Sequence, residues 1–363
     1  MFAARGRDAT ILHPDVPLSR GHGNSVSQPF LVWLEFGVCA VLIALAGWRL
    51  SLYGDVIAEK TGLGGTWIGV VLLASVTSLP ELATGVSAVA AANAPNIAVG
   101  DVLGSCVFNL AILVVLDLVH RGESIYTKAG QGHILSAGFG VLLLGFVGFS
   151  LSLAPQIRGL SLGHIGIYAP VIVVLYLLSI RVVFRYERKQ MAVYAEAAAE
   201  RYPHMTLRQA AVRYALAALV VVGGGIWLPF IGKDIAGIYN WHISFVGTLF
   251  IAAATSLPEL VVTLAAMRLG ALDMAIANLL GSNLFNLLIL AVDDAFYLRG
   301  PLLAHVTGTH VVSVLSALTM TGAVIVGLLY RPPGRLFRTV GWISVLLLCV
   351  YVLNAYVLFR FGG

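Results

Sequence analysis

The sequence contains very little charge. Asp, Glu, Lys and Arg make up only 11% of its 363 residues, whereas soluble domains carry about 25%. Hydrophobic residues account for 59% of the chain, and the mean hydropathy is +0.92. A chain this poor in charge cannot cover a surface that faces water, so the composition excludes an ordinary soluble domain. It predicts a polytopic helical membrane protein.

Cysteine is scarce as well. Cys39, Cys106 and Cys349 each lie within an apolar stretch, which predicts buried thiols and neither a disulfide framework nor a metal-ligand motif. The net charge of +5 is spread over the polar connections rather than gathered in one patch. That distribution argues against nucleic acid as a partner.

Ten apolar stretches follow a polar tail, residues 1–28, which has no signal-peptide pattern and is expected to be disordered. Each stretch reaches the ~20 residues that a helix needs to cross the hydrocarbon core, and backbone groups in lipid must be satisfied internally. The stretches are 30–50, 63–91, 96–119, 131–153, 164–184, 211–232, 241–268, 273–297, 304–329 and 337–360. The sequence therefore predicts an all-α integral membrane protein with ten transmembrane helices.

The longest polar connection, 185–210, separates five spans from five and is expected to hold a short interfacial helix and a turn. Placing it in the cytoplasm puts most Lys and Arg residues inside, as the positive-inside rule requires, and puts both termini outside. The predicted organisation is a first five-helix repeat at 29–184, a cytoplasmic linker at 185–210 and a second five-helix repeat at 211–363.

The two halves share sequence. Thr-Ser-Leu-Pro-Glu occurs at 77–81 and 255–259, and Gly-Ser-x-x-Phe-Asn occurs at 104–109 and 281–286. The matched pairs are Glu81 with Glu259, Ser105 with Ser282, Asp117 with Asp294, His133 with His310 and Ser136 with Ser313. Because each half has an odd number of spans, the second copy enters the membrane inverted. Such repeats place the transported ion near the midplane, between broken helices.

The first motif combines a proline with a carboxylate inside an apolar span. Pro80 and Pro258 each remove a backbone donor, which is expected to free carbonyl groups within 74–77 and 252–255. A carboxylate at the bilayer centre costs roughly 2.5–3.5 kcal/mol on insertion scales. Two of them, Glu81 and Glu259, need a shared compensation, and their charge of −2 matches one Ca2+.

The second motif adds neutral oxygens. Ser105 and Asn109 are four residues apart and share a helix face, as Ser282 and Asn286 do. Such oxygens suit Na+ or complete a Ca2+ shell, and an all-oxygen ligand set argues against Zn2+ and Cu+.

Other polar residues receive structural interpretations. We expect Thr84, Ser87, Thr263 and Ser136 to serve helix packing. Asp117, Asp293 and Asp294 lie near span ends and are expected at the interface, and His133 and His310 are expected to make helix-end contacts rather than to transfer protons. Asp101 is either an interfacial charge or an accessory cation group that shares a helix face with Ser105.

With these two motifs, each present twice, the sequence resembles the Ca2+:cation antiporter superfamily, the sodium/calcium exchangers and their bacterial relatives. The resemblance implies that Ca2+ is bound by Thr77, Glu81, Thr255 and Glu259. It implies that Na+, or both ions, are bound by Ala74, Ser78, Ser105, Asn109, Ala252, Ser256, Ser282 and Asn286, where the two alanines act through their carbonyls.

The resemblance also implies the function: exchange of Ca2+ for Na+ by alternating access, in a bacterial plasma membrane. Asn286 departs from the Asp of many relatives and removes a titratable group, so a Ca2+/H+ antiporter stays open. A Na+/H+ or Mg2+ antiporter on the same frame stays open as well. No nucleophile–base pair or catalytic metal spacing is present, so neither enzyme activity nor a cofactor is expected. The expected partners are inorganic cations and the lipid bilayer.

Overall fold

The computed structural model describes residues 27–61, 75–120, 123–154, 156, 161–191, 204–331, 334–336 and 339–362. Almost all of the predicted tail, residues 1–28, lies outside these ranges. Ala74, the first part of the predicted span 63–91 and residues 192–203 of the predicted linker also lie outside them.

The described chain is almost entirely helical. Its long helices are α1 (Ser27–Lys60), α4 (Pro95–Val119), α6 (Gly132–Leu153), α7 (Tyr168–Met191), α8 (Leu207–Tyr239), α12 (Leu272–Phe296), α13 (His310–Tyr330) and α14 (Trp342–Phe361). Its shorter elements are α3 (Leu79–Ala90), α5 (Ile125–Lys128), α9 (Ile243–Val246), the π-helix η1 (Gly247–Ile251), α10 (Ala252–Thr255), α11 (Leu257–Arg268) and the 3-10 helix η2 (Leu302–His305). The strands β1 (Ser161–Leu162) and β2 (Ile165–Gly166) form a small antiparallel hairpin.

Within the described ranges, eight helices are long and apolar enough to cross a membrane, or nine if the bent pair Ile243–Thr255 and Leu257–Arg268 counts as one span. These correspond to nine of the ten predicted stretches. The remaining stretch, 63–91, is represented by α3 at its described end.

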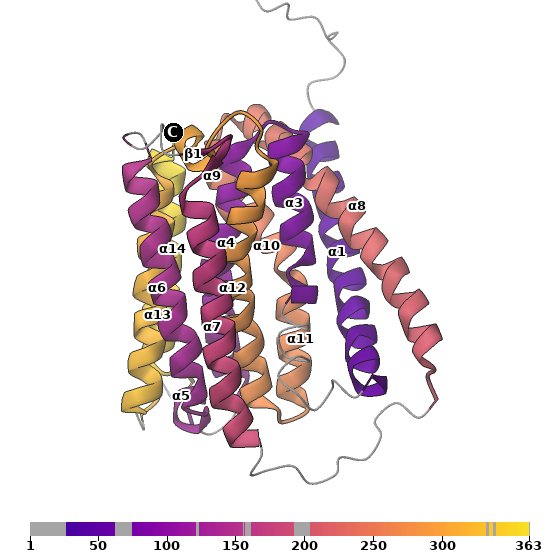
Figure 1. The fold of residues 1–363 in the computed structure, drawn as a ribbon, viewed down its shortest axis with the longest axis vertical. Helices are drawn as coiled ribbons and strands as arrows, with labels where there is room; N and C mark the ends of the chain where they lie inside the picture. The colour runs from indigo at the N-terminus through magenta and orange to yellow at the C-terminus, as the bar shows by residue number, and fades with distance from the viewer. Residues whose placement is uncertain are drawn as a thin grey trace, which may run out of the picture.

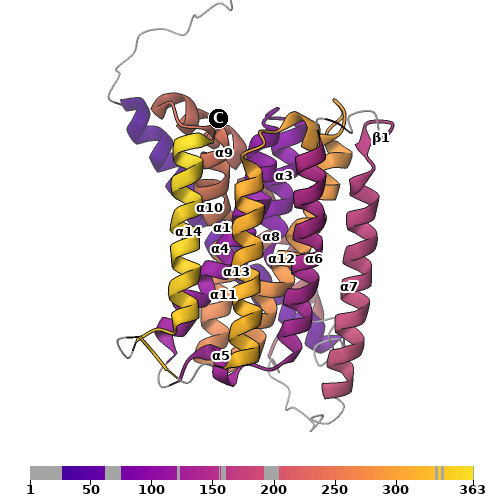
Figure 2. The ribbon, with the colours of Figure 1, turned by 90° about the vertical axis from the view of Figure 1, so that its left-hand side faces the viewer.

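The bundle has a buried centre and an apolar outer surface. The most deeply buried spans are α4 and α12, and α1, α7, α8 and α14 surround them with much lower burial (Figures 1 and 2). Large apolar side chains such as Leu45, Leu219 and Leu353 are exposed on these outer helices. An apolar surface of this extent is suited to lipid rather than to water.

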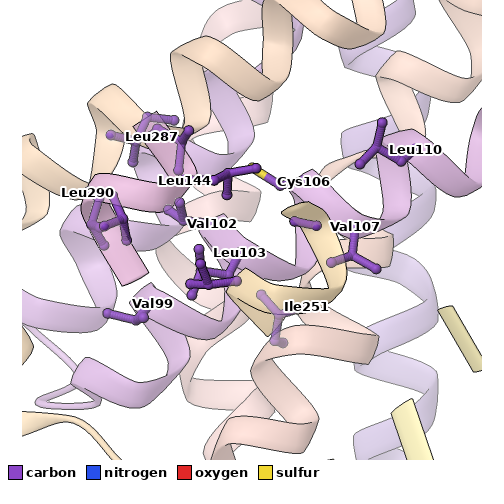
Figure 3. Close-up of a cluster of buried hydrophobic side chains, with 14 of the residues drawn as sticks. Val99, Val102, Leu103, Cys106, Val107, Leu110, Leu144, Ile251, Leu287 and Leu290 are labelled. Atoms are coloured by element: carbon purple, nitrogen blue, oxygen red, sulfur yellow. The ribbon is translucent and has the colours of Figure 1, made fainter. Parts of the chain in front are cut away.

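The apolar side of α4 holds the centre together. Figure 3 shows Val99, Leu103 and Cys106 of α4 beside Ile251 of η1 and Leu287 of α12. All five residues are buried. This packing fixes α4 against both helices, so the polar residues on the rest of α4 are held in place between them.

Two helix breaks lie next to the repeated prolines. Ser256 separates α10 from α11 with φ −87° and ψ 8°, and the two helical segments bend by 43°. Ser78 interrupts the equivalent helix with φ −88° and ψ 14° before α3 begins. Each break therefore falls two residues before its proline. Proline is tolerated there because the first turn of a new helix does not use its missing N–H.

The polar connection differs from the prediction at both ends. Helix α7 continues to Met191, and α8 begins at Leu207. The start of α8 is fixed by a capping box, in which Gln209 N donates to Thr206 Oγ1 at 3.3 Å and Thr206 N donates to Gln209 Oε1 at 3.2 Å. Helix-forming residues such as Arg185 extend the span helix beyond its apolar part. The predicted interfacial helix falls mostly on residues that are not described.

Both described chain ends lie at one end of the bundle, which we call the termini face (Figure 1). Thr309 Oγ1, near the start of α13, donates to Gly362 O at 3.5 Å, and Thr307 N donates to Asn96 Oδ1 at 2.8 Å. The first turn of α4 is therefore at this face. The end of α12 is at the same face, because Leu302 N donates to Asp294 Oδ1 at 2.6 Å and η2 contacts α4.

Candidate functional site

The two repeated glutamates are held by reciprocal contacts between the halves. Ser256 Oγ of the second half donates to Glu81 Oε1 at 2.9 Å, and Ser78 Oγ of the first half donates to Glu259 Oε1 at 3.1 Å. The two serines are equivalent positions of the first motif, as the two glutamates are. Each helix break therefore places a serine next to the carboxylate of the other repeat.

A second pair of contacts repeats the same relation. Thr77 Oγ1 lies 3.2 Å from Ser282 Oγ, and Thr255 Oγ1 lies 3.5 Å from Ser105 Oγ. Ser105 Oγ also donates to Glu81 Oε1 at 3.4 Å. Each threonine of the first motif thus meets the serine of the other half's second motif, which brings all four motifs together.

The carboxylates are buried with part of their hydrogen-bonding capacity unused. Glu81 and Glu259 are both 0% exposed. Their Oε2 atoms have no hydrogen-bond partner of good geometry among the described residues, although the hydroxyls of Thr255 and Thr77 lie nearby. The two carboxylates are also close enough to repel each other. Such a pair is costly in a membrane core unless a cation or protons neutralise it.

A close helix approach places α4 at this site. A Cβ on Gly104 would lie 2.7 Å from the Cβ of Ala252 and 2.7 Å from the Cα of Thr248. Only glycine allows α4 to approach the π-helix and α10 so closely. Ser105, the next residue along α4, then reaches both Glu81 and Thr255.

Asp101 joins the site rather than the membrane interface. Its side chain is 0% exposed, and Thr255 Oγ1 donates to its Oδ1 at 2.8 Å. The interfacial interpretation of Asp101 is therefore wrong. Its position five residues after the start of the predicted span 96–119 suggested the interface, but the loops at the termini face cover that end of the helix.

The amide residues form a network on α4 and α12. Asn109 Nδ2 donates to Asn283 Oδ1 at 3.1 Å, and Asn283 Nδ2 donates to Cys106 O at 3.1 Å. Asn286 is 0% exposed, and neither its Oδ1 nor its Nδ2 has a partner among the described residues. Asn283 was missed by the sequence reasoning. The signal was available, since Asn283 is the second-repeat residue that matches Cys106.

The prediction of a freed carbonyl is wrong for Ala252. Ala252 O accepts from Ser256 N at 3.1 Å and from Thr255 Oγ1 at 3.2 Å, so Pro258 does not free it. The reason is positional: proline removes the donor for residue 254, four positions earlier, whereas the donor for Ala252 is still present. Ala74 lies outside the described residues.

Three aspartates that were expected at the interface are buried. Asp117 accepts from Ile125 N, Gly341 N, Ser124 Oγ and Ser344 Oγ, and Arg335 Nη2 lies 3.4 Å from it. Asp294 accepts from Gly166 N, Leu302 N and the Tyr168 hydroxyl. Asp293 is 0% exposed without a partner among the described residues. All three lie near helix ends, as expected, and connecting segments fold over these ends and bury them.

The predicted helix-end contacts of the two histidines are confirmed. His133 Nε2 lies 2.9 Å from Asp273 Oδ1, and His310 Nε2 lies 3.1 Å from Asn96 Oδ1. Asp273 and Asn96 stand at equivalent positions of the two repeats, at the first turns of α12 and α4. Each histidine therefore contacts a helix end of the other half.

The site can bind a hard cation through oxygen atoms. Across the described ranges, no group of three or more His, Cys, Asp and Glu side chains is placed to hold a metal ion. The available ligands are the two glutamates with surrounding hydroxyl and amide oxygens, a set that suits Ca2+, Na+ or protons rather than Zn2+.

Comparison with known proteins identifies the family of the chain. The sodium/calcium exchanger protein family matches residues 31–185 and 210–357, which is most of the chain. The chain belongs to this family. Its members are exchangers, so the protein is a multi-pass membrane transporter of inorganic cations and not an enzyme.

Individual relatives support the assignment. The uncharacterized membrane protein MJ0091 of Methanocaldococcus jannaschii is 25% identical over 303 residues, 82% of this chain and 88% of its own length. The sodium/calcium exchanger MaX1 of Methanosarcina acetivorans is 49% identical over 53 residues, 14% of this chain and 15% of its own. A structure of the sodium-calcium exchanger NCX_Mj covers 90% of this chain and 98% of its own, with a TM-score of 0.57 and 22% identity.

Proposed function

We propose that this antiporter exchanges Ca2+ for Na+ by alternating access, at a site centred on Glu81 and Glu259. One observation carries the proposal: two buried carboxylates from equivalent positions each accept a hydrogen bond from the other half and keep one oxygen unpaired among the described residues. Two such charges balance one Ca2+ or two monovalent cations. Exchange of this kind needs no cofactor.

The ligand assignment follows from the contacts. Thr77 and Thr255 would complete the Ca2+ shell beside the glutamates, because each hydroxyl lies near the carboxylate of the other half. Na+ would use the neutral oxygens around this centre, from Ser78, Ser105, Asn109, Ser256, Ser282 and Asn286. The carbonyl of Ala252 would join them once Thr255 Oγ1 releases it, and the carbonyl of Ala74 is the proposed equivalent in the first repeat. Asp101 would act as an accessory group through Thr255.

We further propose ten spans, arranged as two inverted five-helix repeats at 29–184 and 211–363 with a cytoplasmic linker at 185–210. The reciprocal histidine contacts support an inverted relation. The two contacts are made by equivalent residues, but one lies at the termini face and the other at the opposite end of the bundle. The start of α4 and the end of α12 share the termini face, as inversion requires. A bacterial plasma membrane is the proposed location.

One observation favours H+ as the alternative coupling ion. Asn286, fully buried, stands in the second repeat without the carboxylate that its motif often contains. Two glutamates alone hold one Ca2+ or two protons, whereas three Na+ would exceed their charge by one. A Na+/H+ or Mg2+ antiporter, in which Ca2+ is not the transported ion, is a further alternative that the same experiment tests.

The test is ion flux in proteoliposomes. Purified protein is reconstituted, and uptake of radioactive Ca2+ is measured against an outward Na+ gradient at constant pH and against a pH gradient without Na+. Uptake that requires Na+ supports the proposal, and uptake that a pH gradient drives alone supports the H+ alternative. Absence of Ca2+ uptake under both gradients, with Na+/H+ or Mg2+ exchange present, would refute Ca2+ as the transported ion.

A further inference from the structure

Asp293 is an acidic residue that the exchange site described above does not use. It lies on α12, seven residues or about two turns beyond Asn286 towards the termini face. Both carboxylate oxygens are unpartnered among the described residues, and the side chain is 0% exposed. Its neighbour Asp294 differs, because two backbone amides and the Tyr168 hydroxyl bind its carboxylate. Asp294 thus has a structural role, whereas no contact of this kind holds Asp293.

The fold brings Asp293 next to the helix that holds Glu81. A Cβ on Gly85 of α3 would lie 2.7 Å from the Asp293 Cγ and 2.5 Å from Oδ1. Glycine at position 85 is thus required for the carboxyl group to fit. Gly85 is one helical turn, about 6 Å, beyond Glu81. Helix α12 also packs against α4, which holds Asp101, so three acids lie on the helices that run from the termini face to the centre of the site.

The equivalent positions on the other side of the site are neutral. In the repeat, Gly85 corresponds to Thr263, Asp101 to Asn278 and Asp293 to Leu116. Asn278 Nδ2 donates to Thr263 Oγ1 at 3.4 Å, a pair of uncharged groups. A buried carboxylate is not needed for the fold at this position, since leucine serves in the other copy. The approach to the site from the termini face therefore carries acidic residues, whereas the equivalent positions on the opposite approach are neutral.

We propose that Asp293 is a second cation-binding carboxylate, which takes up the coupling cation, H+ or Na+, on its path between the termini face and the exchange site. A carboxylate that is buried without a partner is stabilised by a monovalent cation or a proton. The cation then moves by way of Asp101 to Glu81. This inference rests on the proposed exchange at Glu81 and Glu259.

Other titratable groups lie on the elements that pack against α12. Around it, α12 packs against α3, α4, α6, α7, α11, the hairpin and η2. The acids on these elements and on α12 itself are Glu81, Asp101, Asp117, Glu187, Glu259, Asp273 and Asp294, the phenols are Tyr168, Tyr176 and Tyr186, and the imidazoles are His133, His164 and His305. His133 and Asp273 bind each other at the opposite face, His164 binds Ala295 O, and His305 binds Pro301 O. A titration that is lost in Asp293→Asn is therefore separable from those of the structural groups.

The first measurement is side-specific transport by Asp293→Asn in proteoliposomes of uniform orientation. Ca2+ uptake is followed while Na+, and separately pH, is varied on one side at a time. We expect the apparent affinity for the coupling cation to fall roughly tenfold on the termini face only, the effect of one charge about 10 Å away at an effective dielectric constant of ~20. Asp234→Asn is the matched control, because it removes an exposed charge near the same face and should change neither side.

The second measurement does not depend on Ca2+ transport. Infrared difference spectra of the purified protein are recorded on Na+ addition and on a pH jump. We expect a buried carboxyl band that responds to one of these cations in the wild type and is missing in Asp293→Asn. If that variant does not fold, Gly85→Ala crowds the same carboxyl and should shift the band.

The outcomes separate the two proposals. If the wild type transports no Ca2+, the proposed ion pair fails, while the spectra still decide the role of Asp293. A cation dependence that is unchanged, or that is weakened equally on both sides, would overturn the inference. An unaltered carboxyl band in Asp293→Asn would overturn it as well.

Discussion

Neutralising Glu81 removes one of the two charges on which the site depends. In Glu81→Gln the side chain keeps its size. Its amide oxygen can still accept a hydrogen bond from Ser256 Oγ, which lies 2.9 Å from Glu81 Oε1 in the wild type. The variant also relieves the repulsion between Glu81 and Glu259. We therefore expect it to fold at least as stably as the wild type, so a loss of transport would report on ion binding.

The size of the loss follows from the charge. Two unit charges 4 Å apart interact by roughly 4 kcal/mol at an effective dielectric constant of ~20, and a divalent ion doubles this value. If half of it is offset by desolvation, about 4 kcal/mol is left, which is a thousandfold in affinity. Glu81→Gln should thus abolish Ca2+ exchange at micromolar to millimolar Ca2+, and Glu259→Gln should do the same.

Two serine variants calibrate this effect. Ser256→Ala and Ser78→Ala each remove one hydrogen bond to a carboxylate, and such bonds contribute about 1.5–3 kcal/mol. Their Ca2+ affinities should fall by roughly tenfold to a hundredfold, and by similar amounts in the two variants because the contacts are equivalent. The loss of Ca2+ affinity should therefore be larger in the Glu→Gln variants than in the Ser→Ala variants.

The assay is uptake of radioactive Ca2+ into proteoliposomes at matched protein density, with the Ca2+-dependent shift of the unfolding temperature as an independent measure of binding. Near wild-type uptake by Glu81→Gln or Glu259→Gln would refute the two-carboxylate site. A serine variant more damaging than the glutamine variants would show that the hydroxyls, rather than the charges, dominate binding.

Three further predictions concern residues around the site. Asp101→Asn should weaken the Na+ or pH dependence of transport while sparing Ca2+ binding, and unchanged dependence at matched expression would leave Asp101 with a structural role only. Removing the tail 1–28, or replacing 185–210 by a flexible linker, should keep the Ca2+/Na+ preference measured by competition, because neither segment contains a repeated motif. Asp117→Ala should destabilise the protein by about 3–5 kcal/mol, since it leaves Arg335 and buried donors without their acceptor; thermal unfolding should show this loss with ion preference unaltered.

The chain's own pattern determined the class and the centre of this protein. Low charge and long apolar stretches predict membrane helices, because backbone N–H and C=O groups in lipid must be paired within the protein and a helix pairs them within one segment. The duplicated Thr-Ser-Leu-Pro-Glu motif identifies Glu81 and Glu259, because a carboxylate at that depth is too costly to be incidental. Equivalent motifs in two halves also indicate that the residues meet, and the reciprocal contacts of Ser78 and Ser256 agree.

Only the tertiary structure decided which acids are buried and what each one contacts. Asp117, Asp293 and Asp294 all lie near span ends in the sequence, yet their contacts differ. Asp117 accepts hydrogen bonds from several donors, Asp294 accepts from backbone amides and a phenol, and Asp293 has no partner among the described residues. Distance from a span end does not reveal which loops fold over it. The contact of Gly85 with Asp293 joins residues of different repeats, and such packing depends on how the helices meet rather than on any local pattern.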